Sequence, residues 1–339
     1  MVHWDRKAFR RRLMLQIGVL LLLLIIISLT YQHKQEGLDK DAKELQLIAK
    51  EIIPLKEISG MATFKENGKT EIALIGDNKP RILLKSEDKD YDFKNILVER
   101  FSLCQSEDFD DCNRAIKKLT KNWEGLAVDG LLRFFALQEH SQAIVVMNRQ
   151  MDRVEGVLHF NFAAAFSGAV AMGAKKIKRN ALGEGLVLLK NGHVIIAKEA
   201  FPVAFVEFGP EGESALGLTP ETLLGEGEAF LMKEGVFHHK LVPLNTWTLA
   251  THGKCDISDL AIDENKTLLA LSEDCLNIQR YDRLIPGEEA VTRDIYILPG
   301  EIKSPEALAC VNGEWIVGSD VSSKKQYNYY RLSPQSGLK

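Results

Sequence analysis

Acidic residues recur in pairs at matching places along this chain, and they are its strongest candidates for chemistry. In the stretch NWEGLAVDGLLRFFALQE, one glutamate opens a short apolar hairpin and another closes it fifteen residues later. Closely packed carboxylates repel one another unless a cation or hydrogen bonds compensate for the charge. Ca²⁺ takes roughly six to eight oxygen ligands, so acids gathered by the fold predict a divalent-cation site. The pairs are Glu124 with Glu139, Glu184 with Glu199, and Glu306 with Asp320.

These hairpins belong to a longer repeat. Five phrases can be superimposed: ISGMA (58–62), WEGLA (123–127), GEGLV (183–187), ISDLA (257–261) and PEALA (305–309). A second apolar run follows each phrase and ends in an acid, and turn residues such as Asn-Gly separate the two runs, which is typical of β-hairpins. In the first and fourth phrases Ser59 and Ser258 replace the leading glutamate, and the closing acids are Asp77 and Glu273.

A hairpin that recurs every 48–74 residues predicts a β-propeller, in which each repeat is one blade of about four strands around a central channel. We therefore expect an all-β domain over residues 54–332, with outer strands at 143–148 and 228–244. Five blades with long insertions fit the spacing, and so does a sixth blade between residues 199 and 255. The rival interpretation is a β-sandwich with a chance repeat.

Circular symmetry would bring the leading and closing acids to one end of the channel. We expect each leading acid to lie beside the closing acid of its own hairpin, which gives an acidic channel mouth. Six of the acids are the predicted metal ligands, with Ca²⁺ as the expected ion: Glu124, Glu139, Glu184, Glu199, Glu306 and Asp320. Asp77, Glu273, Ser59 and Ser258 complete the mouth. The alternative is that the acids only accept backbone hydrogen bonds that tie blades together.

The phrases resemble those of the exported phytase-like propellers, also described as having an esterase-like activity of phytase. The chain also resembles related propellers that open on E-I-S-G, here residues 57–60. The resemblance covers about residues 54–332 and implies export, a β-propeller and Ca²⁺-assisted phosphoester chemistry. Glu124, Glu184 and Glu306 match the phrase, whereas Ser59 and Ser258 depart from it.

His140, which directly follows Glu139, is the candidate general base for such chemistry. A surface histidine is the alternative. The cations near the closing acids, among them Arg81, Lys198 and Lys324, could hold a phosphate group, although solvated surface charges are the simpler interpretation.

The N-terminus predicts a membrane anchor. Residues 13–30 are free of charge, and five basic residues precede them. A helix of about 17–20 apolar residues spans the hydrocarbon core, and its basic flank stays in the cytoplasm. We expect a cytoplasmic tail (1–12), an uncleaved anchor (13–30) and a linker (31–53). The chain would then be a single-pass inner-membrane protein with a periplasmic propeller. A cleaved signal peptide is the alternative.

Cysteine usage agrees with export. Cys255 and Cys275 flank one predicted hairpin, so a disulfide can join them at its open end. Cys104 and Cys112 enclose a short acidic loop and form a second candidate pair, while Cys310 is expected as a buried free thiol. Five reduced thiols are the alternative. None of the cysteine and histidine spacings is typical of a zinc site.

The charge distribution narrows the class of partner. The chain carries −4 overall, but the first 30 residues carry +4, which leaves −8 on the remainder. A nucleic-acid-binding surface needs the opposite sign, so nucleic acid is excluded as a partner. The predicted function is binding of a small-molecule ligand, a partner protein or a divalent cation at the acidic channel mouth. The alternative is a metal-dependent phosphoesterase.

Overall fold

The computed structural model describes residues 42–76, 81–86, 91–95, 119, 121–166, 182–199, 202–249 and 255–334. The expected anchor at 13–30, Asp77 and the Cys104–Cys112 pair lie outside these residues. Within them, no helix combines the length and the hydrophobicity that crossing a membrane requires. From Lys43 onward, the described residues belong to one compact unit.

This unit is built almost entirely of β-strands, with α3 (Phe162–Ala165) and η3 (Lys190–Gly192) as short helical turns. The strands fall into five groups, which we name by their inner strands. The β2 group holds β2 (Ile58–Glu66), β3 (Lys69–Gly76), β4 (Arg81–Ser86) and β5 (Tyr91–Asn95). The β6 group holds β6 (Trp123–Val128), β7 (Phe134–Gln138), β8 (Ala143–Met147), β9 (Val154–His159) and β13 (His238–Lys240). The β10 group holds β10 (Gly183–Leu188), β11 (Val194–Lys198), β12 (Ala204–Gly209) and β14 (Val242–Thr248).

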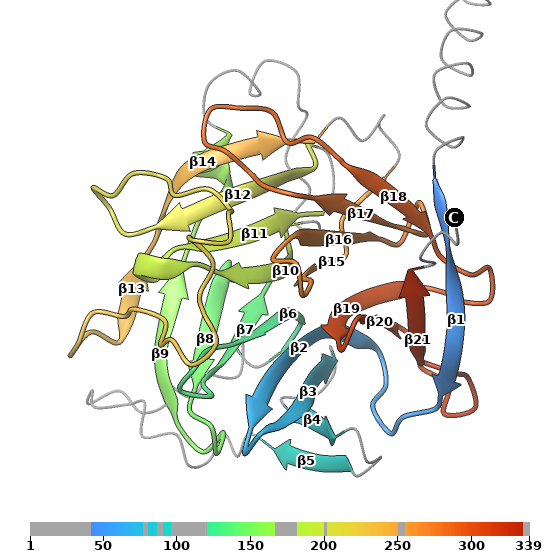
Figure 1. Ribbon diagram of the computed structural model, residues 1–339. Coiled ribbons are helices and arrows are strands. Elements are labelled where there is room, and N and C mark those ends of the chain that lie inside the picture. The colour runs from blue at the N-terminus through green and yellow to red at the C-terminus, as the bar shows by residue number, and fades with distance from the viewer. Residues whose placement is uncertain are drawn as a thin grey trace, which may run out of the picture. The chain divides into compact units, whose positions relative to one another are not determined.

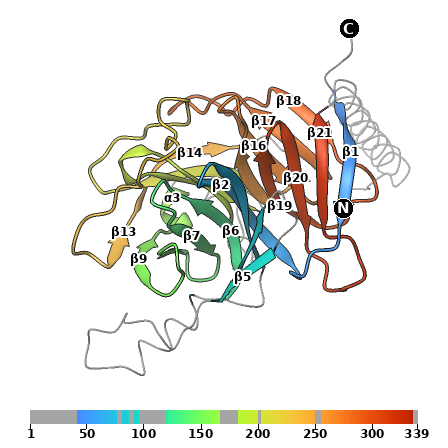
Figure 2. The same ribbon diagram turned by 60° about the horizontal axis from the view of Figure 1, so that its bottom comes forward.

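The last two groups share one sheet. The β15 group holds β15 (Asp259–Ile262), β16 (Leu268–Ser272), β17 (Asn277–Tyr281) and β18 (Asp294–Ile297). The β19 group holds β19 (Pro305–Val311), β20 (Glu314–Ser319), β21 (Tyr329–Pro334) and β1 (Lys43–Glu51). The strand β1 joins the two groups, because it pairs in parallel with β18 and antiparallel with β21 (Figure 2).

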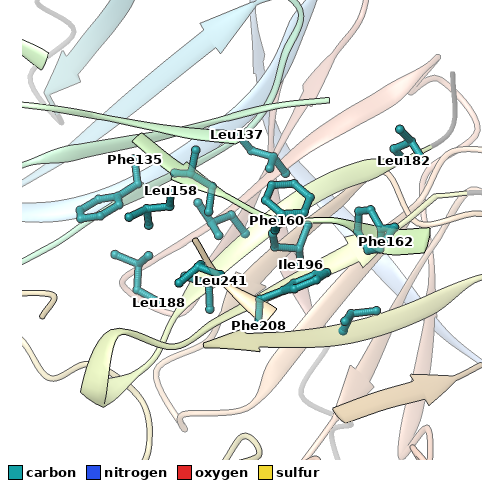
Figure 3. Packing of buried hydrophobic residues seen from close by; sticks show 14 of the residues in the cluster. Phe135, Leu137, Leu158, Phe160, Phe162, Leu182, Leu188, Ile196, Phe208 and Leu241 are labelled. Carbon is teal, nitrogen blue, oxygen red and sulfur yellow. The ribbon is translucent and has the colours of Figure 1, made fainter. Parts of the chain in front are cut away.

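The inner strands form a closed ring. β2 contacts β6, β6 contacts β10, β10 contacts β15, β15 contacts β19, and β19 contacts β2 (Figure 1). A hydrophobic cluster fills each of the interfaces between neighbouring groups. Figure 3 shows the cluster between the β6 and β10 groups, to which Phe135 and Leu158 contribute from one group and Ile196 and Phe208 from the other. The described unit is therefore a β-propeller.

Packing on both faces explains the apolar character of the strands. Every residue of β7, β8, β11, β12 and β16 is buried. A sheet that is covered on both sides has no polar face, so its strands show continuous apolar runs instead of alternation. The hairpin turns form where the sequence indicates them. Asn191-Gly192 and Asn312-Gly313 have positive φ at both residues, as type I′ turns require.

A β-bulge lies at the leading position of three of the five phrases, and in β10 it lies one residue later, at Gly185. Pairing in β2, β6, β10 and β19 shifts register immediately after the first or second residue of the phrase. In the fourth phrase, the Ser258 N–H bonds the Leu271 carbonyl although Asp259 is already aligned with Leu271. Bulges redirect side chains at the edges of sheets. The bulges therefore turn the side chains near the start of each phrase in a direction that a regular strand would not give them.

Two segments differ from the sequence prediction. Residues 43–51, expected in the linker, form β1, so the β domain begins before residue 54. Residues 228–244 do not form one hairpin. Here β13 pairs with β9 in the β6 group, while β14 pairs with β12 in the β10 group. The outer strand expected at 143–148 is confirmed as β8.

The disulfide predicted between Cys255 and Cys275 is confirmed, with 5.2 Å between the two Cα atoms. It joins the segment that enters β15 to the turn that follows β16, at the same end of the group as the leading and closing acids. Cys310 is a free thiol, half-buried rather than fully buried.

Candidate functional site: an acidic cluster at the channel mouth

Three glutamates converge where the β6 and β10 groups meet. One carboxylate oxygen each from Glu139, Glu184 and Glu199 lies within 4.8 Å of the other two. Glu139 follows β7, while Glu184 leads β10 and Glu199 follows β11. Glu139 is buried and the other two are half-buried. The leading and closing positions of neighbouring groups are therefore brought together at this end of the channel.

Two further leading glutamates lie close enough to affect this trio. Burial raises the pKa of Glu184 well above its ordinary value, and repulsion from Glu124, Glu199, Glu139 and Glu306 raises it further. Glu124, Glu184 and Glu306 are the leading residues of the β6, β10 and β19 groups, so their charges meet around the channel axis. We call Glu124, Glu139, Glu184, Glu199 and Glu306 the acidic cluster.

Further acids extend the region of negative charge beyond the acidic cluster. Burial raises the pKa of Glu199 to about 7, with added repulsion from Glu139, Asp256 and Asp274. Burial also raises the pKa of Glu273, as do the charges of Asp256, Asp274 and Asp320. The pKa of Asp320 is raised by burial and by Glu57. Four of the five strand groups thus contribute residues either to the acidic cluster or to the neighbouring acids Asp256, Glu273, Asp274 and Asp320. Glu57 lies beside β2 of the fifth group.

The pairing of acids differs in part from the prediction. Glu184 and Glu199 do meet within one hairpin. Two closing acids also approach the next group: Glu139 lies beside the leading Glu184, and Asp320 interacts with Glu57, which precedes β2. A closing residue stands at the edge of its sheet, where the neighbouring group packs closely against it.

Sequence reasoning missed Asp256 and Glu57. Asp256 is buried and accepts hydrogen bonds from Ser272 Oγ at 2.6 Å and from the Asp274 N–H at 3.0 Å. Each missed acid stands two residues before the leading serine of its phrase, in EISG and DISD. In these two phrases serine replaces the leading glutamate, so the acid has moved two residues upstream. That exchange is visible in the sequence and could have identified them.

The two serines at leading positions tie neighbouring groups together. Ser59 Oγ donates to the Trp123 carbonyl at 2.5 Å, and Ser258 Oγ donates to the Pro305 carbonyl at 3.0 Å. Both serines are buried. Their observed contacts are those of structural pins rather than of metal ligands, which is the alternative that the sequence left open.

Lys198 introduces a positive charge beside the acidic cluster. Its side chain is fully buried, which corrects the interpretation of this residue as a solvated surface charge. Burial lowers the pKa of Lys198, while the charges of Glu199 and Glu139 raise it. This lysine therefore compensates part of the negative charge from within the fold and is not placed on the surface to hold a phosphate.

His140 lies at the edge of the acidic cluster. Its Nδ1 atom is 3.3 Å from Oε2 of Glu139, and half of its side chain is exposed. The other oxygen of Glu139, Oε1, accepts a hydrogen bond of 3.1 Å from the Leu182 N–H. His140 is thus within reach of anything that binds at Glu139, as the sequence predicted, and its role as a general base remains a prediction.

The trio fits a calcium ion. Ca²⁺–oxygen distances are about 2.3–2.6 Å, so two ligand oxygens on opposite sides of the ion are up to about 5 Å apart. The 4.8 Å limit for Glu139, Glu184 and Glu199 is within this span.

No protein-family model matches the sequence, and no curated protein matches it. Solved structures with a similar course of the chain include the β-propeller domain of Cps50 (Swd1) from Myceliophteria thermophila, with 8% identity, a TM-score of 0.38, and coverage of 82% of this chain and 71% of that one. They also include a PQQ-bound aldose sugar dehydrogenase from Streptomyces coelicolor (11%, TM-score 0.43, 86% and 98%). A third is a glutaminyl cyclase from Myxococcus xanthus (10%, TM-score 0.42, 86% and 96%). We transfer no activity from them, and none of the three is named as a phytase.

Proposed function

We propose that this chain is a membrane-anchored, extracytoplasmic β-propeller of five blades whose acidic cluster binds a divalent cation, with Ca²⁺ as the expected ion. The observation that carries the proposal is the convergence of Glu139, Glu184 and Glu199 within 4.8 Å. Carboxylate oxygens are the ligands that Ca²⁺ prefers. Glu124 and Glu306 add negative charge from two further blades.

The raised pKa values of Glu184 and Glu199 support a bound cation. A carboxylate whose pKa is raised by burial and by like charges is destabilised in its charged form. A bound cation reverses that effect, because its positive charge favours the carboxylate over the acid. Lys198 supplies positive charge near Glu139 and Glu199, and a divalent ion would supply more.

The proposed location follows from the N-terminal sequence and the disulfide. The uncharged run at 13–30 with its basic flank would anchor the chain in the inner membrane. The Cys255–Cys275 disulfide suits an oxidising compartment such as the periplasm. An acidic channel mouth held near the membrane is suited to binding a cationic ligand or a partner protein through the ion.

A metal-dependent phosphoesterase is the second candidate, and one observation favours it. A cavity of about 790 Å³ is lined by Lys56, Arg81 and Lys324. Glu57 also lines this cavity and interacts with Asp320, so the cavity adjoins one of the acids at the channel mouth. Cationic side chains beside a metal site are the arrangement that holds a phosphate group during transfer. In this function His140 would act as the general base.

Thermal unfolding of the full chain with Ca²⁺ and with EDTA tests cation binding. A ligand present at about 100 times its Kd stabilises the folded state by about 2.7 kcal/mol, which corresponds to a midpoint shift of about 5 °C. We expect that shift for the unaltered protein and its loss in Glu184→Gln. Glu301→Gln is the matched control, because Glu301 is exposed and pairs with Lys50. Equal midpoints in Ca²⁺ and EDTA would contradict the proposal.

A panel of phosphate esters separates the two candidates. Turnover that needs Ca²⁺ and falls at least tenfold in both Glu184→Gln and Arg81→Gln would establish the phosphoesterase. Ca²⁺ binding without turnover on any ester of the panel would leave the binding function and exclude the hydrolase for those substrates.

A further inference from the structure

The strand β13 covers the outer edge of the β6 group. It is three residues long and pairs in parallel with β9, which would otherwise be the outermost strand of its sheet. Two backbone hydrogen bonds of 2.8 Å flank this pairing. The Val157 N–H donates to the Phe237 carbonyl, and the Leu241 N–H donates to the carbonyl of His159. An uncovered strand edge presents N–H and carbonyl groups that can pair with another chain, so β13 protects β9 from such pairing.

Two histidine side chains join β13 to β9. The Nε2 atom of His159 on β9 lies 3.0 Å from the Nδ1 atom of His238 on β13. Two neutral rings make one N–H···N hydrogen bond in this arrangement, and one neutral ring with one protonated ring can do the same. When both rings are protonated, both nitrogens are donors, no acceptor remains, and the two positive charges repel each other. The contact therefore requires that at least one of the two rings is neutral.

A third histidine places a buried nitrogen against the same strand. The Nε2 atom of His239 on β13 is buried and has no hydrogen-bond partner among the described residues. A Cβ atom built on Gly156 of β9 would lie 3.6 Å from the Cδ2 atom of this ring. Protonation would place a charged N–H group where no acceptor meets it, which is unfavourable for a buried atom. The position of His239 therefore also favours a neutral ring.

The electrostatics of the three rings agree with their geometry. Burial lowers the pKa of His159, and the charge of His238 lowers it further. Burial also lowers the pKa of His239, a backbone hydrogen bond at Val236 opposes this change, and the charge of His238 adds to it. A histidine whose pKa is lowered binds fewer protons in the folded state than in the unfolded chain. Its contribution to stability is therefore present above about pH 6.5 and is lost as the pH falls below that value.

The neighbouring charges do not compensate for protonated histidines. Glu155 is the one carboxylate on the described strands β8, β9 and β13, and it is paired with Arg153 at 2.8 Å and lies 4.0 Å from Arg133. Lys240 is exposed and aligned with the histidine of β9, so it adds positive charge. The turn before β13 adds two exposed residues of opposite charge, Lys233 and Glu234. Acidification therefore gathers positive charge along the contact between β9 and β13.

We propose that β13 is a pH-dependent cover over the edge of β9, closed at neutral pH and displaced when acidification charges His159, His238 and His239. Displacement leaves the rest of the β6 group intact, because β9 keeps its antiparallel pairing with β8. The cover is independent of the cation site, because β13 is the outermost strand of the group and β6 is the innermost. Acidification thus exposes a strand edge that is protected at neutral pH.

Hydrogen–deuterium exchange of the full chain in detergent tests the proposal. Exchange is read by peptide mass spectrometry in EDTA at pH 7.5 and pH 5.0, and each rate is divided into the intrinsic amide rate at that pH to give a protection factor. We expect the protection of peptides containing Val157 and Leu241 to fall at least tenfold at pH 5.0. The Arg293 N–H, which bonds the Arg280 carbonyl at 2.8 Å, is the internal reference and should lose no protection. Unchanged protection at β9 and β13, or an equal fall at the reference, would overturn the proposal.

Two variants assign the pH dependence to the histidines. His159→Gln places a neutral amide near the position of Nε2, and this amide can donate to or accept from His238 in either of its protonation states. We expect the fall in protection to shrink to less than threefold in His159→Gln and to disappear when His239→Gln is added. Lys240→Gln is the matched control, because it removes a neighbouring charge but keeps all three histidines, and its fall should stay at fivefold or more. A tenfold fall in His159→Gln, or its loss in Lys240→Gln, would contradict the proposal.

Discussion

The carboxylate of Asp259 on β15 accepts a hydrogen bond of 2.7 Å from the backbone N–H of Leu308 on β19. Its other oxygen accepts from the Leu260 N–H at 2.8 Å. Asp259 is fully buried, and burial raises its pKa well above the ordinary value, while backbone hydrogen bonds from Leu308, Leu260 and Met61 oppose the rise. One side chain thus joins three of the five strand groups beside the channel axis.

Removing this side chain should destabilise the domain. In Asp259→Ala the Leu308 N–H stays buried without its acceptor, which costs about 1–3 kcal/mol of unfolding free energy. Asp259→Asn keeps one oxygen acceptor, so we expect a smaller loss. Urea unfolding measures both changes. Asp282→Ala, at an exposed site paired with Arg293, is the control and should differ little from the unaltered protein. Equal stability of Asp259→Ala and the control would argue against this role.

Gly185 tests the close approach of the inner strands. Its φ of +69° is unfavourable for other residues, and a Cβ atom would lie 2.4 Å from the Leu260 nitrogen. Gly185→Ala therefore combines backbone strain with a steric clash, and we expect a loss of about 3 kcal/mol or more. Gly212 also has a positive φ, of +91°, but has open space around it. Gly212→Ala should cost about 1 kcal/mol, from the backbone alone. Equal losses in urea unfolding would contradict the steric argument.

Stability should fall with rising pH in the absence of metal. The pKa of Glu199 is raised from 4.5 to about 7, so between these values the folded state binds more protons than the unfolded state, and stability decreases as pH increases. The full shift would correspond to about 3 kcal/mol, and solvent screening at this half-buried group lowers the expected effect to about 1–2 kcal/mol. Urea unfolding in EDTA at pH 5 and pH 8 measures it. Glu199→Gln should flatten the profile, and an unchanged slope would exclude Glu199 as its cause.

Replacing Lys198 should strengthen cation binding while it weakens the metal-free protein. Lys198→Met keeps the length of the side chain and removes a charge that interacts with Glu199 and Glu139. Attraction of a divalent ion to those carboxylates then increases, and we expect Ca²⁺ affinity to rise about threefold or more by calorimetric titration. In EDTA at pH 8 the variant should unfold at lower urea. Lys303→Met, at an exposed site, is the control. Unchanged Ca²⁺ affinity in Lys198→Met would place the ion elsewhere.

The fold could be predicted largely from local patterns. Phrases such as WEGLA and GEGLV mark inner strands, because only small apolar side chains fit where strands crowd, and the Asn-Gly turns fix their hairpins. β1 could not be predicted in this way. Of its residues only Leu45 is fully buried, and its partners are β18 and β21, more than 200 residues away. β13 is three residues long and pairs with a different group from β14, so its place also depends on tertiary contacts.

The acids were predicted as a set, but their partners were not. The gathering of Glu139, Glu184 and Glu199 follows from hairpin symmetry. The contact of Glu139 with the next group depends on how closely neighbouring groups pack. The pairing of strands within one hairpin gives no information about that packing. The burial of Lys198 was missed for a similar reason, since its position beside Glu199 resembles a solvated strand end until the neighbouring group covers it.

The strand β1 also constrains when the domain can finish folding. Its Leu47 is aligned with Leu332 of β21, so the ring is completed by residues near opposite ends of the polypeptide. Contacts of such long sequence separation form late and slow folding. During synthesis the edge of β1 that faces β21 stays unpaired until this last strand has emerged. An interrupted or truncated chain therefore lacks its final closure and exposes strand edges that proteases and chaperones recognise.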